Sequence, residues 1–218
     1  MLAPNGKIYC VPWNSTAVLI IDPETNTAVQ NITIDQIIGN WSGGVLAPNG
    51  KIYCVPHESP TVLIIDPLTD TAEQTGITGL LGDGKWKGGV LALNGKIYCV
   101  SSNSTAVLII DPATDTAEQT SITGITGEYT GGVLAPNGKI YCVPSDSTTV
   151  LIIDPATDTA EQTSITGITG GYAGGVLAPN GKIYCVPYIS TVMLIIDPLG
   201  TQKTVPLNRG LSAYYNKF

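Results

Sequence analysis

The chain has 218 residues, of which 12% are charged and 43% hydrophobic, and its 25 glycines and 15 prolines are turn formers. A formal net charge of -7 argues against the clustered Lys and Arg that a phosphate backbone requires, so nucleic acid is not expected as a partner. No apolar run reaches the roughly 20 residues that span a bilayer, and the first residues lack the regions of a signal peptide. We therefore expect a compact all-β protein, with neither a membrane span nor a signal peptide in this sequence.

An internal repeat of 43 to 45 residues organises the chain. A string close to Asn-Gly-Lys-Ile-Tyr-Cys-Val occurs five times, and each copy is followed by Ile-Ile-Asp-Pro; the lysines are Lys7, Lys51, Lys96, Lys139 and Lys182. A repeat of this period with hairpin signals in every unit is typical of β-propellers. We predict one domain over residues 1–218, a five-bladed β-propeller in which each blade is a four-stranded antiparallel sheet. Its repeat units span approximately 1–42, 43–87, 88–130, 131–173 and 174–218.

The fourth unit illustrates the strands expected in each blade. Residues 131–136 are predicted as the inner strand A, whose Gly-Gly pair leaves room around a crowded axis. The Asn-Gly pair that follows predicts a two-residue hairpin turn with positive φ at both residues, leading into strand B over 139–143. Strand C, 150–153, is continuously apolar, as expected for a blade covered on both faces. An Asp-Pro turn, whose aspartate accepts local N–H groups, precedes the polar outer strand D over 159–164.

The two ends of the chain match successive parts of one inner strand. Residues 1–4 align with 133–136, and Tyr215 follows Asp197 at the spacing at which Tyr172 follows Asp154. Residues 214–218 are therefore predicted to supply the first half of the inner strand of the first blade. The N- and C-terminal segments would then share this strand and close the ring. The alternative is that the chain is one stretch of a longer tandem array.

The repeat also carries a resemblance. The unit Leu-Ala-Pro-Asn-Gly-Lys-Ile-Tyr-Cys-Val, followed by Val-Leu-Ile-Ile-Asp-Pro-x-Thr-Asp-Thr, resembles the YVTN-type propeller repeat of bacterial and archaeal surface proteins and, more loosely, the kelch repeat. It is similar as well to the Gly-Lys-Ile-Tyr repeats of uncharacterised algal and protist proteins. The chain departs from those families after strand B, where it has Pro12, Pro56, Ser101, Pro144 and Pro187. The resemblance covers essentially the whole chain and implies a fold but no activity.

Five cysteines occupy one equivalent position in strand B: Cys10, Cys54, Cys99, Cys142 and Cys185. The repeat spreads them around a ring, beyond disulfide reach, and no pair has metal-site spacing. We expect free thiols that pack as small hydrophobic residues, and neither a metal nor a cofactor. Four sequons provide candidate glycosylation sites, at Asn14, Asn31, Asn40 and Asn103. Free thiols also suit a reducing cytosol, so the compartment stays open, although the sequons favour an extracellular location.

The strand order places the A–B and C–D turns on one side of the propeller and the B–C and D–A loops on the other. The first side, here called the uniform face, is nearly the same in all repeats, as turn chemistry alone would explain. The second, the variable face, holds the differences. Its candidate ligand-binding residues are Trp13, His57 and Tyr188 in the B–C loops and one aromatic per D–A loop, Trp41, Trp86, Tyr129, Tyr172 and Tyr215. Exposed aromatics suit sugars or protein partners, but they could instead fill gaps between blades.

Catalysis is not expected. The acids near the variable face, among them Glu58 and Asp146, lack a nucleophile and base pair or a metal triad, and the single histidine, His57, suits an ordinary solvated loop. We expect a non-catalytic module that binds carbohydrate or protein through the variable face. The first alternative is a structural building block of a surface layer or extracellular filament, formed by self-assembly or by neighbouring tandem repeats. The second is a glycosidase- or lyase-like enzyme.

Overall fold

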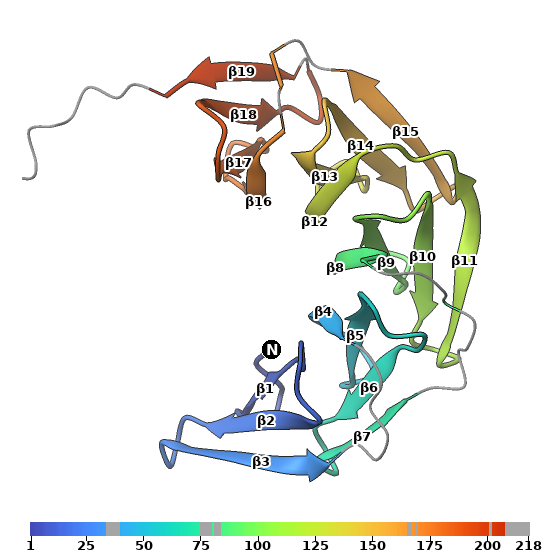
Figure 1. The fold of residues 1–218 in the computed structure, drawn as a ribbon, viewed down its shortest axis with the longest axis vertical. Helices are drawn as coiled ribbons and strands as arrows, with labels where there is room; N and C mark the ends of the chain where they lie inside the picture. Colours follow the sequence, from blue (N-terminus) through green and yellow to red (C-terminus); the bar gives the residue numbers. More distant parts are fainter. Residues whose placement is uncertain are drawn as a thin grey trace, which may run out of the picture.

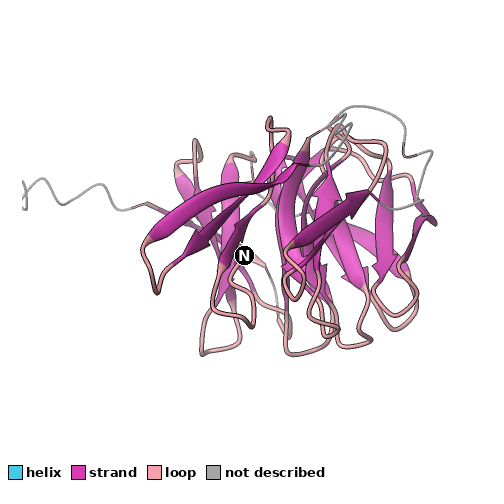
Figure 2. Ribbon diagram, turned by 90° about the horizontal axis from the view of Figure 1, so that it is seen from below, coloured by secondary structure: helices cyan, strands magenta, loops and turns pink. Residues whose placement is uncertain are grey.

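A computed structural model of the chain describes residues 1–33, 40–74, 80, 84–164, 167–168, 170–200 and 202–207. Its regular elements are strands, in five antiparallel sheets that follow one another along the sequence and around a common axis (Figures 1 and 2). The predicted all-β fold with five blades is confirmed. In the part of the chain that the structure describes, no helix has the length and apolar character needed to cross a membrane.

Each sheet runs from an inner strand near the axis to an outer strand at the rim. The first sheet contains β1 (Ile8–Cys10), β2 (Ala17–Asp22) and β3 (Thr27–Thr33), the second β4 (Trp41–Leu46), β5 (Ile52–Pro56), β6 (Leu63–Asp66) and β7 (Thr71–Gln74), and the third β8 (Trp86–Leu91), β9 (Ile97–Ser101), β10 (Ala106–Asp111) and β11 (Thr116–Thr123). The fourth contains β12 (Glu128–Leu134), β13 (Ile140–Asp146), β14 (Thr149–Asp154) and β15 (Thr159–Ser164), and the fifth β16 (Tyr172–Leu177), β17 (Ile183–Pro187), β18 (Val192–Ile196) and β19 (Lys203–Pro206).

The hairpin between β12 and β13 differs from the prediction in its turn. Gly138 has a φ of 80°, but Asn137 is not among the residues with positive φ, so the expected two-residue turn is wrong. The Gly138 N–H donates to the carbonyl of Ala135 at 2.9 Å, and the Ala135 N–H donates to the carbonyl of Lys139 at 2.9 Å. These bonds define a three-residue loop, in which Pro136 starts a tight turn and Gly138 provides the left-handed residue that ends it. The Asp-Pro turn is as predicted, because the Asp154 carboxylate accepts the N–H of Ala156 at 3.0 Å.

The core of the protein lies between the sheets. Each sheet has two sets of side chains: the forward face is the set on the side of the next sheet, and the backward face is the set on the side of the previous sheet. Where two sheets are neighbours, the forward face of one packs on the backward face of the other. Between the first two sheets, Tyr9, Val18 and Ile20 of the forward face meet Ile52 and Leu63 of the backward face. Three further clusters repeat this pattern between the later sheets. Burial on both faces explains why strand C is continuously apolar, as the sequence predicted.

The two glycines of each inner strand have different roles. Gly43, Gly88 and Gly131 have positive φ, and a Cβ on Gly43 would lie 3.2 Å from the Cα of Gly88, so the first glycine allows the inner strands to approach one another. The second glycine lies between sheets. A Cβ on Gly132 would lie 3.0 Å from methyl groups of Ile140 and of Val90 in the preceding sheet. The Gly-Gly pair therefore meets two packing requirements. The first glycine allows close approach at the axis, as predicted, and the second allows close approach between sheets.

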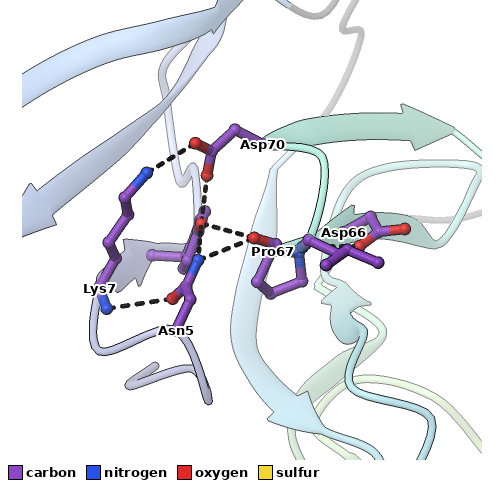
Figure 3. Close-up of polar contacts among 7 residues, drawn as sticks. Asn5, Lys7, Asp66, Pro67 and Asp70 are labelled. Atoms are coloured by element: carbon purple, nitrogen blue, oxygen red, sulfur yellow. Dashed lines mark hydrogen bonds and ion pairs between the residues drawn. The ribbon is translucent and has the colours of Figure 1, made fainter.

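The uniform face connects neighbouring sheets, and turn chemistry alone does not explain it. Figure 3 shows the first connection: the Asn5 amide donates to the carbonyl of Pro67 at 2.7 Å, and Lys7 pairs with Asp70 at 2.7 Å. The Tyr9 hydroxyl donates to the Asp70 carboxylate. Equivalent bonds from Asn49, Asn94 and Asn137 reach the next sheet at Pro112, Pro155 and Pro198. The Asn-Gly-Lys-Ile-Tyr string is thus a clasp between sheets as well as a hairpin turn.

The clasp makes stability sensitive to alkaline pH. Burial, followed by the bond to Asp70, raises the pKa of Tyr9 from its ordinary value of 10.0 to about 12, and burial raises the pKa of Tyr53 and Tyr98 in the same direction. A raised folded-state pKa favours the neutral phenol, so its stabilising effect is complete below the unfolded value and is lost as pH rises through the folded value. We expect Tyr53→Phe to flatten the fall in stability above pH 10, as measured by urea unfolding at a series of pH values. Tyr188→Phe, at a side chain that is 79% exposed and outside the clasp, is the matched control.

Closure of the ring is not shown. Residues 214–218, which were predicted to complete the first inner strand, lie outside the described residues. In the described part of the chain, the first sheet has three of its four expected strands, and the start of the chain meets its inner edge, where the Tyr9 N–H donates to the carbonyl of Met1 at 2.9 Å. Among the described residues, the sheets β1–β3 and β16–β19 stand at opposite ends of an open arc (Figure 1).

Candidate functional site

The aromatic residues that precede the Gly-Gly pairs lie in the interior. Trp41, Trp86, Tyr129 and Tyr172 are at most 2% exposed, in the clusters between sheets. The indole N–H of Trp86 donates to the carbonyl of Ala106 at 2.9 Å, and that of Trp41 to the carbonyl of Thr61 at 2.9 Å. These four side chains fill gaps between sheets, so the structure removes them from the candidate ligand site. Tyr215, the fifth of the series, lies outside the described residues.

One group of predicted residues does come together on the variable face. The loop between β1 and β2 presents Trp13, which is 49% exposed, and the loop between β5 and β6 presents His57. Their ring centroids lie 4.7 Å apart, with the ring planes inclined by 50°. Beside His57, the Glu58 carboxylate accepts a hydrogen bond from the Asn40 side-chain amide at 2.6 Å. Two aromatic rings, a carboxylate and an amide therefore form one polar and aromatic cluster, here called the Trp13 site.

The backbone holds the loops of this site in place. The carbonyl of Asn40, just before β4, accepts the N–H groups of His57 at 2.9 Å and Glu58 at 3.1 Å. The carbonyl of His57 in turn accepts the N–H of Lys85, in the third sheet, at 3.0 Å. Loops of the first, second and third sheets thus form or support the Trp13 site, so its geometry depends on the relative positions of neighbouring sheets.

His57 is a neutral imidazole in this setting. Its side chain is 14% exposed, and its Nδ1 is buried with no hydrogen-bond partner among the described residues, since the Glu58 carboxylate is 4.0 Å away. Burial lowers the pKa of His57 below its ordinary value, which outweighs the opposing effect of Glu58. A neutral ring has one donor and one acceptor nitrogen, and because Nδ1 is buried, Nε2 is the nitrogen left to bond a ligand hydroxyl group.

Lys85 and Asn40 are members of this neighbourhood that sequence reasoning did not assign to it. Lys85 is 3% exposed, and its ammonium group lies 5.9 Å from the ring centroid of Trp86, within the range of a cation–π contact. The sequence signal for Lys85 was its uniqueness, because only the second repeat unit, 43–87, places lysines on both sides of its aromatic residue. Asn40 was a candidate for glycosylation and not for ligand binding.

The other predicted residues do not join the Trp13 site. Tyr188 is 79% exposed in the fifth sheet, at the far end of the arc, next to Ile189, which is 74% exposed. Asp146 lines a shallow hollow in the fourth sheet with Thr126 and Ser147. No cluster of three His, Cys, Asp or Glu side chains suited to a metal ion occurs within the described ranges.

The sequons and cysteines are placed as follows. Asn14 and Asn103 are exposed in loops, Asn40 is half-buried and bonded to Glu58, and Asn31 lies in β3 with its side chain outside the described part. All five cysteines are free thiols, as predicted; four are buried and Cys10 is half-buried. Burial raises the pKa of Cys54, Cys99, Cys142 and Cys185, so these thiols are protonated at neutral pH.

Comparison with known proteins places the fold. No protein-family model matches the chain, and no curated protein matches it in sequence. Among solved structures it is similar to virginiamycin B lyase from Staphylococcus aureus, with a TM-score of 0.79 and 11% identity, over 95% of this chain and 68% of that chain. It is also similar to an auxiliary nutrient binding protein from Bacteroides ovatus, with a TM-score of 0.63 and 18% identity, over 94% of this chain and 56% of that chain.

A third similar structure is the extracellular domain of a one-component system from B. thetaiotaomicron, with a TM-score of 0.71 and 14% identity, over 96% of this chain and 29% of that chain. These likenesses define the class of the protein: it has the fold of a β-propeller. An enzyme, a binding protein and a sensor domain share that fold at low identity, so fold alone assigns no activity.

Proposed function

We propose that this chain is a non-catalytic β-propeller repeat module of the YVTN type that binds a carbohydrate at the Trp13 site. The supporting observation is the half-exposed Trp13 indole next to the neutral His57 ring and the Asn40–Glu58 pair. A sugar offers C–H faces that stack on indole and hydroxyl groups that bond to carboxylate, amide and imidazole, which are the groups gathered here. Surface stacking of this kind gives weak individual affinities, which several linked sites would strengthen.

Carbohydrate is favoured over the alternatives for physical reasons. A protein partner would be expected to bury a larger apolar patch, whereas the aromatic part of the Trp13 site consists of two rings. Glycosidase chemistry needs two carboxylates across a bond, but here the single carboxylate of Glu58 is already bonded to an amide. The building-block role remains the alternative, and it would not require the Trp13 site at all.

Trp13 provides its own reporter, because the other two of the three tryptophans, Trp41 and Trp86, are at most 1% exposed. We expect the Trp13 fluorescence of the whole chain to change on titration with a sugar chosen from a glycan array. Trp13→Ala should abolish this change and weaken binding at least tenfold, about 1.4 kcal/mol, in calorimetry. Tyr188→Ala, which removes an even more exposed aromatic in the fifth sheet, is the matched control and should bind as the parent does. An array without hits, or equal binding by the Trp13→Ala variant, would refute the proposal.

A further inference from the structure

The two end sheets each expose a face that the other sheets bury. The backward-face residues Ile52, Cys54, Leu63 and Ile65 of the second sheet are fully buried, and their counterparts in the third, fourth and fifth sheets are at most 1% exposed. The same positions in the first sheet, Ile8, Cys10, Leu19 and Ile21, are only half-buried. At the other end, the forward-face residues Val176 and Val186 are 62% and 52% exposed. The counterparts of Val186, which are Val55, Val100 and Val143, are fully buried against the next sheet, and those of Val176, which are Val45, Val90 and Val133, are buried or half-buried.

The polar clasp is left incomplete in the same way. In the four complete interfaces, an asparagine amide bonds to the tyrosine hydroxyl of its own sheet and to a proline carbonyl of the next. In the fifth sheet, the Asn180 amide is already bonded to the Tyr184 hydroxyl at 2.9 Å, and no later sheet supplies a carbonyl among the described residues. The proline that would serve in the first sheet is Pro23. The exposed face of the fifth sheet and the exposed face of the first sheet therefore correspond to the two sides of the interface that occurs four times within the chain, in both their apolar and their polar groups.

The spacing of the sheets limits what these faces can receive. A Cβ on the second glycine would lie 2.8 to 3.1 Å from its nearest neighbour in all four complete sheets, so valine-on-glycine contact fixes the distance between sheets. Closing five sheets into a ring would alter all four of these packed contacts together. The open arc superposes on the lyase structure over 95% of the present chain. About a third of the lyase chain has no counterpart in the arc. The open side is thus about half as large as the five sheets, which suits about two sheets and excludes a second in-plane copy of the whole arc.

We propose that the backward face of the first sheet and the forward face of the fifth are docking surfaces for about two further sheets of this same repeat, which complete the ring. The occupant has defined chemistry. It presents an Ile, Cys, Leu and Ile face with an Asp-Pro carbonyl to the fifth sheet, and a Tyr and Val face with an Asn amide to the first. This proposal does not depend on carbohydrate binding at the Trp13 site.

The test compares the 218-residue chain with an extended chain that carries a second copy of residues 88–175 directly before Met1, so that glycine precedes Met1 as Gly175 precedes Val176. Val186→Cys in both chains reports on the forward face by thiol labelling, which peptide mass spectrometry assigns to position 186. In the 218-residue chain this thiol should react rapidly. In the extended chain, as a monomer, it should react at least tenfold more slowly, and the melting temperature should rise.

Leu199→Cys is the matched control, because Leu199 is 91% exposed on the outer corner and its counterpart Leu68 is 92% exposed within the arc. It should react equally in both chains. Unchanged labelling of position 186 in the extended chain would overturn the proposal. Protection already present in a monomeric 218-residue chain would overturn it in favour of a closed five-sheet ring. Protection that appears with a doubled mass would overturn it in favour of a second copy. Val176→Cys, read in the same way, replaces Val186→Cys should that variant fail to fold.

Discussion

Trp86→Ala is expected to remove about 3–5 kcal/mol from the free energy of unfolding. The indole is fully buried between the second and third sheets, where it packs with Val45, Tyr53 and Leu108. Its replacement leaves a large cavity and removes the donor to the Ala106 carbonyl. Urea unfolding followed by circular dichroism measures the loss, which is about half of the stability of a typical domain.

Two comparisons make this result specific. Trp86→Phe retains most of the buried volume and loses only the N–H bond and part of the ring, so it should cost about 1–2 kcal/mol. Trp13→Ala removes the same side chain from a half-exposed position and should cost less than about 0.5 kcal/mol. Equal losses for Trp13→Ala and Trp86→Ala would contradict the assignment of Trp86 to the core and of Trp13 to the surface.

Gly132→Val is expected to cost about 1–3 kcal/mol or more through overpacking. A Cβ at this position would already lie 3.0 Å from Ile140 and Val90 and 3.2 Å from Val100, and the two valine methyl groups would reach further into those side chains. Because Gly132 does not have positive φ, the cost arises from contact between sheets rather than from backbone strain. Thermal and urea unfolding of the single variant measure it.

The same contact predicts a rescue. Val100→Ala should be destabilising alone, since it leaves a cavity between the third and fourth sheets. Combined with Gly132→Val, it should cost clearly less than the sum of the two single losses, because the added methyl groups occupy the space that Val100 vacates. Strict additivity would show that the second glycine is not needed for packing against the preceding sheet.

The candidate site could be predicted only in part. The strand order places all B–C loops on the variable face. Trp13 and His57 were identifiable because they occupy the B–C loop position that differs from repeat to repeat. Their approach to 4.7 Å was not identifiable, since it depends on loops from two sheets. Trp41, Trp86, Tyr129 and Tyr172 were equally conspicuous in the sequence, yet they are buried. Whether an aromatic at the end of a loop faces solvent or the next sheet is set by the stagger between sheets, which is a long-range property.

The repeat pattern predicts the five sheets, the strand order within each sheet and the Asp-Pro turns, because these follow from apolar patterns and backbone preferences within about 40 residues. It predicts the position of each Asn-Gly hairpin but not its three-residue loop. The remaining features depend on contacts between sheets. The Asn5 amide meets the Pro67 carbonyl 62 positions away, so a string that reads as a hairpin turn is also a clasp between sheets. The distance between sheets likewise depends on valine side chains packed on glycines of the following sheet. The geometry of this contact depends on both sheets of a pair, so the sequence of a single repeat does not determine it.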